Sequence, residues 1–251
     1  MTQRQEKILY RAIEQYINTG EPVSSSALQG MAGFDVSPAT VRSEMNSLEE
    51  EGFLEQPHIS SGRIPTDKAY RLYVNKVVLE KSLNGKNEKN DGAAKKFARQ
   101  AAPALESGDE FQMVRELART LSDYTSSLAM AYFQDEGLLL KEGWDEITRL
   151  QEFERNRTMR SFAEMVENFE KEMRDFDDEF TRTHNEILLR IGRELECDKS
   201  GEFSVMAFEC RTPKNKKKIS VALLGPKRMP YRRNINLLKS AKKIMENKHY
   251  G

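Results

Sequence analysis

The stretch SPATVRSEMNSLEEEGFLEQPHISSGRIPT, residues 37–66, predicts a helix followed by a β-hairpin. Ser37 is a preferred helix N-cap residue, and Pro38 is tolerated in the first turn because its missing N–H has no helical partner there. Gly52 closes the helix after about Glu51. The apolar side chains of this helix are three and four residues apart, so we expect one buried face made of Val41, Met45 and Leu48.

Two short extended runs follow Gly52 and flank a Ser-Ser-Gly turn, which is a hairpin pattern. Pro57 and Pro65 restrict both runs to edge positions, because proline cannot donate to a strand ladder. Thr66 then provides the N-cap of another helix.

Two further helices precede this stretch. Thr2 and Gln5 have capping-box spacing, and the apolar residues after them repeat as in an amphipathic helix over 3–18 that Gly20 ends. Serines 24–26 offer N-caps to a short helix up to Met31, closed near Gly33. Three helices and a hairpin predict a winged helix-turn-helix domain over residues 1–81.

The rest of the chain predicts an α+β domain over residues 110–251. It is preceded by a segment rich in Asn, Gly and Lys, residues 82–109, that we interpret as a linker. We expect helices at 110–124, 144–154, 157–176 and 234–247, and strands at 127–134, 186–191, 203–210 and 217–224.

Composition excludes several classes of protein. Forty basic and forty acidic residues leave no net charge among 251 residues, and no apolar run approaches the ~20 residues of a membrane span. The start of the chain lacks a secretory segment, so we expect a cytoplasmic protein with no membrane partner. The two cysteines and three histidines lack metal-ligand spacing, and no nucleophile, base or phosphate loop is recognisable. We therefore expect no metal, no cofactor and no enzymatic activity.

The helix after Ser37 carries side chains suited to reading DNA. Beside its buried face, Ala39, Arg42, Ser43 and Asn46 turn outward. Ala39 and Thr40 lie at the helix entry, and the N-cap residue Ser37 is a further candidate contact. Arg and Asn can make paired hydrogen bonds to guanine and adenine in the major groove. The hairpin adds residues that can hold phosphates or probe the minor groove: His58, Ser60, Ser61 and Arg63.

The local charge opposes this interpretation. Residues 1–75 hold 7 basic and 10 acidic side chains, whereas phosphate neutralisation supplies much of the affinity for DNA. An alternative therefore stays open: a winged-helix protein-interaction module joined to a small-molecule sensor domain. If the module binds duplex DNA, its contact area is modest, and a homodimer spanning two half-sites roughly 34 Å apart would supply the missing affinity.

The sequence resembles the HrcA family of heat-inducible transcription repressors. The resemblance runs from Gln3 to Val74 and is most specific in SPATVR, residues 37–42, and EQPHISSGRIPT, residues 55–66. Weaker likenesses lie in KEGWDEI, residues 141–147, IGRE, residues 191–194, and GPKRMPY, residues 225–231.

The resemblance implies a winged-helix DNA-binding domain followed by a GAF-like dimerisation and regulatory domain. It further implies a homodimer on an inverted-repeat operator of chaperone genes, and a GroEL-type chaperonin as a partner. Family members are longer and carry an inserted dimerising segment, so this chain resembles a shortened form with a reduced GAF-like domain. The sequence thus predicts a sequence-specific, double-stranded-DNA-binding repressor of heat-shock genes in the stress response.

Overall fold

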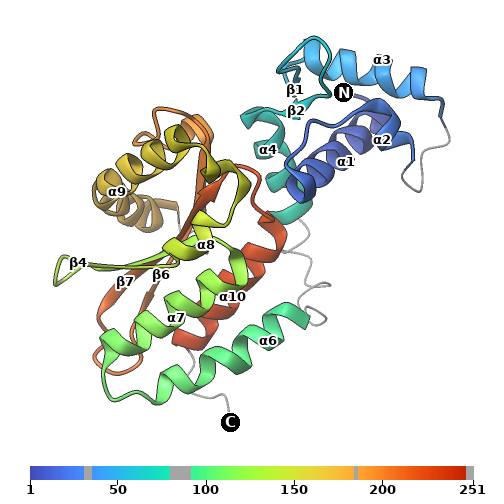
Figure 1. Ribbon diagram of the computed structural model, residues 1–251. Helices are drawn as coiled ribbons and strands as arrows, with labels where there is room; N and C mark the ends of the chain where they lie inside the picture. Colours follow the sequence, from blue (N-terminus) through green and yellow to red (C-terminus); the bar gives the residue numbers. More distant parts are fainter. Residues whose placement is uncertain (31–35, 80–91, 184–185, 247–251) are drawn as a thin grey trace. The chain divides into compact units, whose positions relative to one another are not determined.

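The computed structural model describes residues 1–30, 36–79, 92–183 and 186–246 (Figure 1). The chain divides into two compact units, Met1–Lys86 and Asn87–Gly251. Both contain helices and antiparallel strands, as expected for the α+β class. None of the helices in the described ranges has the length and apolarity needed to span a membrane.

The first unit begins with helices whose ends follow the expected capping. Thr2 and Gln5 form a capping box at the start of the first helix, and Gly20, with a left-handed φ of 69°, ends it. Ser24 and Ser37 cap the next two helices through their side chains. The expected closure near Gly33 lies outside the described residues. The three helices are α1(Gln3–Thr19), α2(Ser25–Gln29) and α3(Pro38–Glu50).

The three helices enclose a small apolar core. The predicted face of α3 is fully buried, with Val41, Met45 and Leu48 each 0% exposed. The first helix contributes Ile8 and Leu9, which are equally buried. Burial of these side chains stabilises the unit by roughly 1.5 to 3 kcal/mol for each large one.

A short hairpin follows α3. Strand β1(Leu54–Glu55) pairs antiparallel with β2(Ile64–Pro65), so that Leu54 lies opposite Pro65. Thr66 accepts a hydrogen bond from the Ala69 N–H and thereby caps the next helix. That helix, α4(Asp67–Tyr73), continues into the π-helical segment η1(Val74–Leu79).

The second unit is built on a five-stranded antiparallel sheet in the order β4-β3-β7-β6-β5. Its strands are β3(Leu128–Phe133), β4(Leu138–Glu142), β5(Leu188–Ile191), β6(Phe203–Arg211) and β7(Lys218–Pro226). Its longer helices are α6(Gly92–Ala101), α7(Glu110–Thr125), α9(Asn156–Thr183) and α10(Tyr231–Glu246), and its shorter ones are η3(Ala102–Glu106), α8(Trp144–Thr148), η4(Gln151–Glu154) and η5(Gly192–Glu194).

Side chains on both faces of this sheet are buried. On one face, the rings of Phe162 in α9 and Phe203 in β6 lie 5.1 Å apart. On the other, Phe111 of α7 contacts Phe133 of β3, with ring centroids 4.6 Å apart. Every residue of β3 is consequently buried, which explains its continuous apolar sequence LAMAYF.

Several elements differ from the sequence-based expectations. The helix expected at 144–154 forms as the two short helices α8 and η4, and the helix expected at 157–176 continues to Thr183. Residues 138–142, for which no strand was predicted, form the edge strand β4. Part of the expected linker, residues 92–106, is helical, and α6 packs on α7 and α10 through the buried Phe97, whose ring lies 5.8 Å from that of Tyr124. Residues 82–91 of the expected linker lie outside the described residues. The segment that forms α6 is rich in Ala and Lys and has one large apolar side chain, Phe97, so its sequence shows no helical hydrophobic period. Its helix became evident only from the burial of Phe97 in the folded structure.

A buried carboxylate holds the turn between β6 and β7. Glu110, 4% exposed, accepts hydrogen bonds at Oε1 from the backbone N–H of Lys214 (3.1 Å) and of Asn215 (2.7 Å). Its Oε2 accepts from Asn215 Nδ2 at 2.9 Å. Burial raises the pKa of Glu110, but these hydrogen bonds and one from Thr212 outweigh it, so the pKa lies below its ordinary value.

Replacing Glu110 should destabilise the second unit. Glu110→Ala removes the acceptor shared by two backbone N–H groups and the Asn215 amide, and should lower the free energy of unfolding by roughly 1 to 3 kcal/mol in urea titrations. Glu116→Ala, on the exposed side of the same helix, should change the free energy of unfolding little.

Because the pKa of Glu110 is lowered in the folded protein, its carboxylate stabilises the fold above pH 4.5, and this contribution disappears as the pH falls through the folded pKa. The difference in unfolding free energy between the wild type and Glu110→Gln should therefore shrink as the pH is lowered, and a difference that grew instead would contradict this assignment.

Candidate nucleic-acid interface

The exposed face of α3 contains the four side chains expected to turn outward. Ala39, Arg42, Ser43 and Asn46 are all exposed. Arg42 makes no hydrogen bond or ion pair with any residue that the structure describes. Its guanidinium is therefore available to a ligand.

Ser37 and Thr40 have structural roles at the helix entry. The Ser37 hydroxyl oxygen accepts a hydrogen bond from the Thr40 N–H at 3.1 Å, and the two hydroxyls lie 3.0 Å apart. This cap satisfies one of the free N–H groups at the start of α3. Both residues lie at the expected place, with their hydroxyls already hydrogen-bonded within the protein.

The tip of the hairpin is held by its own hydrogen bonds. Ser61 Oγ accepts from the His58 N–H at 3.1 Å and donates to the His58 carbonyl at 2.8 Å. Gln56 Nε2 donates to the carbonyl oxygens of Ile59 (3.0 Å) and Ser61 (2.9 Å). His58 and Ser60 are exposed, and Ile59 is 100% exposed. The tip is thus an ordered turn that presents an isoleucine to solvent.

The base of the hairpin is attached to the segment before α2. Val23 and Arg63 exchange backbone hydrogen bonds, N–H to carbonyl, at 2.9 Å in both directions. Gly62 lies so close to this segment that a Cβ on it would lie 2.5 Å from the Val23 carbonyl oxygen and 2.6 Å from that of Pro22. Glycine is required here because any side chain would overlap the backbone.

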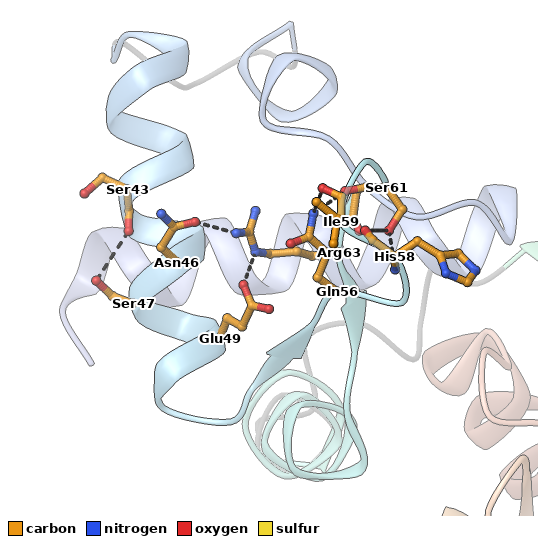
Figure 2. Close-up of polar contacts among 10 residues, drawn as sticks. Ser43, Asn46, Ser47, Glu49, Gln56, His58, Ile59, Ser61 and Arg63 are labelled. Atoms are coloured by element: carbon orange, nitrogen blue, oxygen red, sulfur yellow. Dashed lines mark hydrogen bonds and ion pairs between the residues drawn. The ribbon is translucent and has the colours of Figure 1, made fainter.

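The Arg63 side chain joins the hairpin to α3 (Figure 2). Its Nε donates to Glu49 Oε2 at 2.8 Å, and its Nη2 donates to Asn46 Oδ1. The Arg63 side chain is only 12% exposed. Arg63 was expected to contact a backbone or groove directly; in this structure its guanidinium is engaged within the protein.

Two acidic residues of α3, Glu44 and Glu49, form ion pairs with arginines. Besides the Glu49–Arg63 pair, Arg4 Nη1 lies 3.4 Å from Glu44 Oε1. Just beyond the helix, the terminal amine of Met1 lies 3.9 Å from Glu51 Oε2. Such exposed pairs add little stability, but they reduce the negative field near the exposed face.

Sequence reasoning missed three residues of this arrangement. The pairing of Glu49 with Arg63 was not predicted, Gln56 had no assigned role, and Ile59 was not singled out. A glutamate three residues after Asn46 and an isoleucine within a polar turn were visible signals. Their partners became clear only with the backbone path of the hairpin.

No group of three or more His, Cys, Asp or Glu side chains suited to a metal ion occurs within the described ranges.

Comparisons with known proteins agree with the sequence resemblance. The family model described as HrcA protein C terminal domain matches residues 68–235, about two thirds of the chain. A heat-inducible transcription repressor HrcA of Moorella thermoacetica is 39% identical over 137 residues, covering 55% of this chain and 38% of that relative. The HrcA of Thermodesulfovibrio yellowstonii is 53% identical over 74 residues, which is 30% of this chain and 21% of the relative.

Among solved structures, a hypothetical protein at 2.2 Å resolution is similar with a TM-score of 0.65 and 20% identity, covering 98% of both chains. That likeness concerns the fold alone. The family match shows that the chain belongs to the HrcA family, whose curated members cited above are named heat-inducible transcription repressors. The matched stretches cover only about a fifth to two fifths of the length of the curated relatives cited above.

Replacing Gly62 should displace the hairpin. Gly62→Ala forces the backbone away from residues 22–23 and should cost about 1 to 3 kcal/mol of stability in the first unit. Amide hydrogen exchange at Val23 and Arg63 should accelerate. Gly30→Ala is the matched control, since its nearest atoms would lie at 3.7 Å. Equal exchange rates in both variants would contradict the close-contact assignment.

Proposed function

We propose that the first unit is a winged helix-turn-helix domain that binds double-stranded DNA, and that the protein is a sequence-specific repressor of heat-shock genes. The observation that carries the proposal is the exposed face of α3. Arg42, which has no partner among the residues that the structure describes, lies there on the same helix as Asn46 and beside an attached hairpin. Membership of a family whose curated relatives are named heat-inducible transcription repressors supports the regulatory role.

The chemistry of α3 suits the major groove. Ala39 and Ser43 are small, so the helix backbone can approach the bases closely. Arg42 lies near the N-terminal half of α3, the part with which recognition helices contact base edges. An arginine there can donate two hydrogen bonds to guanine O6 and N7.

The hairpin serves as the wing in this proposal. His58 and Ser60 are exposed and can donate to phosphates, whereas the Ser61 hydroxyl and the Arg63 guanidinium mainly maintain the geometry of the hairpin. Ile59 is available for apolar contact with sugars or base edges in the minor groove.

The second unit is assigned a GAF-like dimerisation and regulatory role. Its antiparallel sheet with helices against both faces is compatible with a reduced GAF-like fold, and the family relation supports a homodimer on an inverted-repeat operator. A GroEL-type chaperonin is the proposed further partner, on the family relation alone. The ion pairs leave the excess of acidic side chains over residues 1–75 unchanged, but they place an arginine beside Glu44 and beside Glu49, close to the exposed face of α3.

Salt titration tests DNA binding. Affinity of the full chain for duplex DNA should fall steeply between about 50 and 200 mM salt, because phosphate contacts release counterions. Arg42→Ala should weaken binding to the preferred duplex by roughly 1 to 3 kcal/mol and relax the preference at one base position.

Arg11→Ala is the control for this experiment. Arg11 is also an exposed arginine, but it lies on α1 and pairs with Glu14. Salt-independent binding, or equal losses for Arg11→Ala and Arg42→Ala, would refute the assigned interface.

The wing tip makes a separate prediction. Ile59→Ser should reduce affinity for duplex DNA several-fold, by about 1 kcal/mol, since less apolar surface is buried on binding. The melting temperature should not change, because the side chain is fully exposed in the free protein. Leu138→Ser, at an exposed leucine of the second unit, should leave DNA affinity intact. Unaltered affinity in Ile59→Ser would remove the tip from the interface.

A further inference from the structure

The orientation of the Asn46 amide is determined by its partner. A guanidinium carries only N–H donors, so the atom that faces Arg63 Nη2 must be the carbonyl oxygen Oδ1 of Asn46 (Figure 2). The amide nitrogen Nδ2 has no hydrogen-bond partner among the residues that the structure describes, and the side chain is exposed. Asn46 therefore presents two N–H donors to a ligand, while one of the two lone pairs on its carbonyl oxygen is already occupied by Arg63.

Arg63 is well placed to hold this orientation. Its backbone is paired with Val23 on both its N–H and its carbonyl, and its Nε donates to Glu49. These contacts fix the guanidinium at both ends of the side chain, which is largely buried. The Asn46 amide is consequently oriented before any ligand arrives.

Resting on the proposed DNA-binding function, we infer that Asn46 selects guanine and disfavours adenine, and that Arg63 is the positioning residue for this choice. In the major groove guanine presents two acceptors, O6 and N7, which match the two N–H donors of Nδ2. Adenine presents the N7 acceptor beside the N6 amino donor, and its paired recognition requires the asparagine oxygen as well.

Charge adds to this discrimination. The guanidinium beside Oδ1 creates a positive potential at the position where an adenine or cytosine amino group would have to approach. At this position the amino groups of adenine and cytosine are disfavoured, and the acceptor atoms of guanine are favoured. Glu49 pairs with Nε of the same guanidinium and reduces this potential, so the hydrogen bond from Nη2 to Oδ1 contributes most of the discrimination.

The test is selection of bound duplexes from random DNA with the full chain, comparing wild type, Asn46→Asp, Arg63→Met, Arg63→Lys and Arg42→Ala. We expect the wild type to enrich guanine at the position that changes in Asn46→Asp. The aspartate keeps an acceptor for Arg63 but has no donor, so guanine preference should fall by about five- to a hundred-fold. Cytosine, whose amino group donates, should gain.

The Arg63 variants separate positioning from stability. Arg63→Met frees the amide to turn, so adenine should become tolerated at that one position while other positions stay unchanged. Arg63→Lys keeps a donor for Oδ1 and should retain much of the guanine preference. Arg42→Ala should relax a different position. Thermal melting of each variant checks that it folds. If Arg63→Met does not fold, the other two variants still test the inference: Asn46→Asp keeps an acceptor for Arg63, and Arg63→Lys keeps a donor for Asn46 Oδ1.

The outcomes distinguish this inference from the function on which it rests. An enriched inverted repeat with adenine at the Asn46 position, or one that Asn46→Asp leaves unchanged, would overturn the inference and leave DNA binding intact. If the wild type enriches no sequence, the proposed function is wrong and the inference falls with it.

Discussion

The backbone pairing of Val23 with Arg63 is the contact on which the candidate interface depends. It joins the segment before α2 to the base of the hairpin, and the absence of a side chain at Gly62 permits the close approach. With the Arg63 backbone held there, its side chain reaches α3 and contacts Asn46 and Glu49. A hairpin of two-residue strands would otherwise be too weak to hold a defined orientation.

The same contact reconciles an acidic helix with a nucleic-acid ligand. Glu49 lies close to the proposed base-reading side chains, where a free carboxylate would repel phosphate. Pairing with Arg63 compensates that charge and uses it to orient the guanidinium. Glu49 therefore contributes to the geometry of the interface, and the field beside Asn46 differs from the one that residue counts alone suggest.

The second unit depends on a different constraint, the burial of both faces of its sheet. Aromatic contacts from α7 and α9 cover opposite faces of the sheet, at β3 and at β6. The buried Glu110 then holds the β6–β7 turn by accepting backbone hydrogen bonds, so that a polar turn is tied to an apolar core. Nothing in the spacing of Glu110 along its helix predicted this role, since its partners lie more than a hundred residues away.

Local chemistry was sufficient to predict much of the fold. The caps at Thr2, Ser37 and Thr66, the helix end at Gly20 and the buried stripe of α3 follow from near neighbours in the chain, because capping and amphipathicity are short-range properties. The exposure of Arg42 and Asn46 followed from the same periodicity. The helix α6, the attachment of the hairpin and the orientation of the Asn46 amide did not, because each depends on residues brought together only by folding. The sequence alone therefore determined which side chains α3 exposes, whereas the tertiary structure decided which of their atoms remain free to bind.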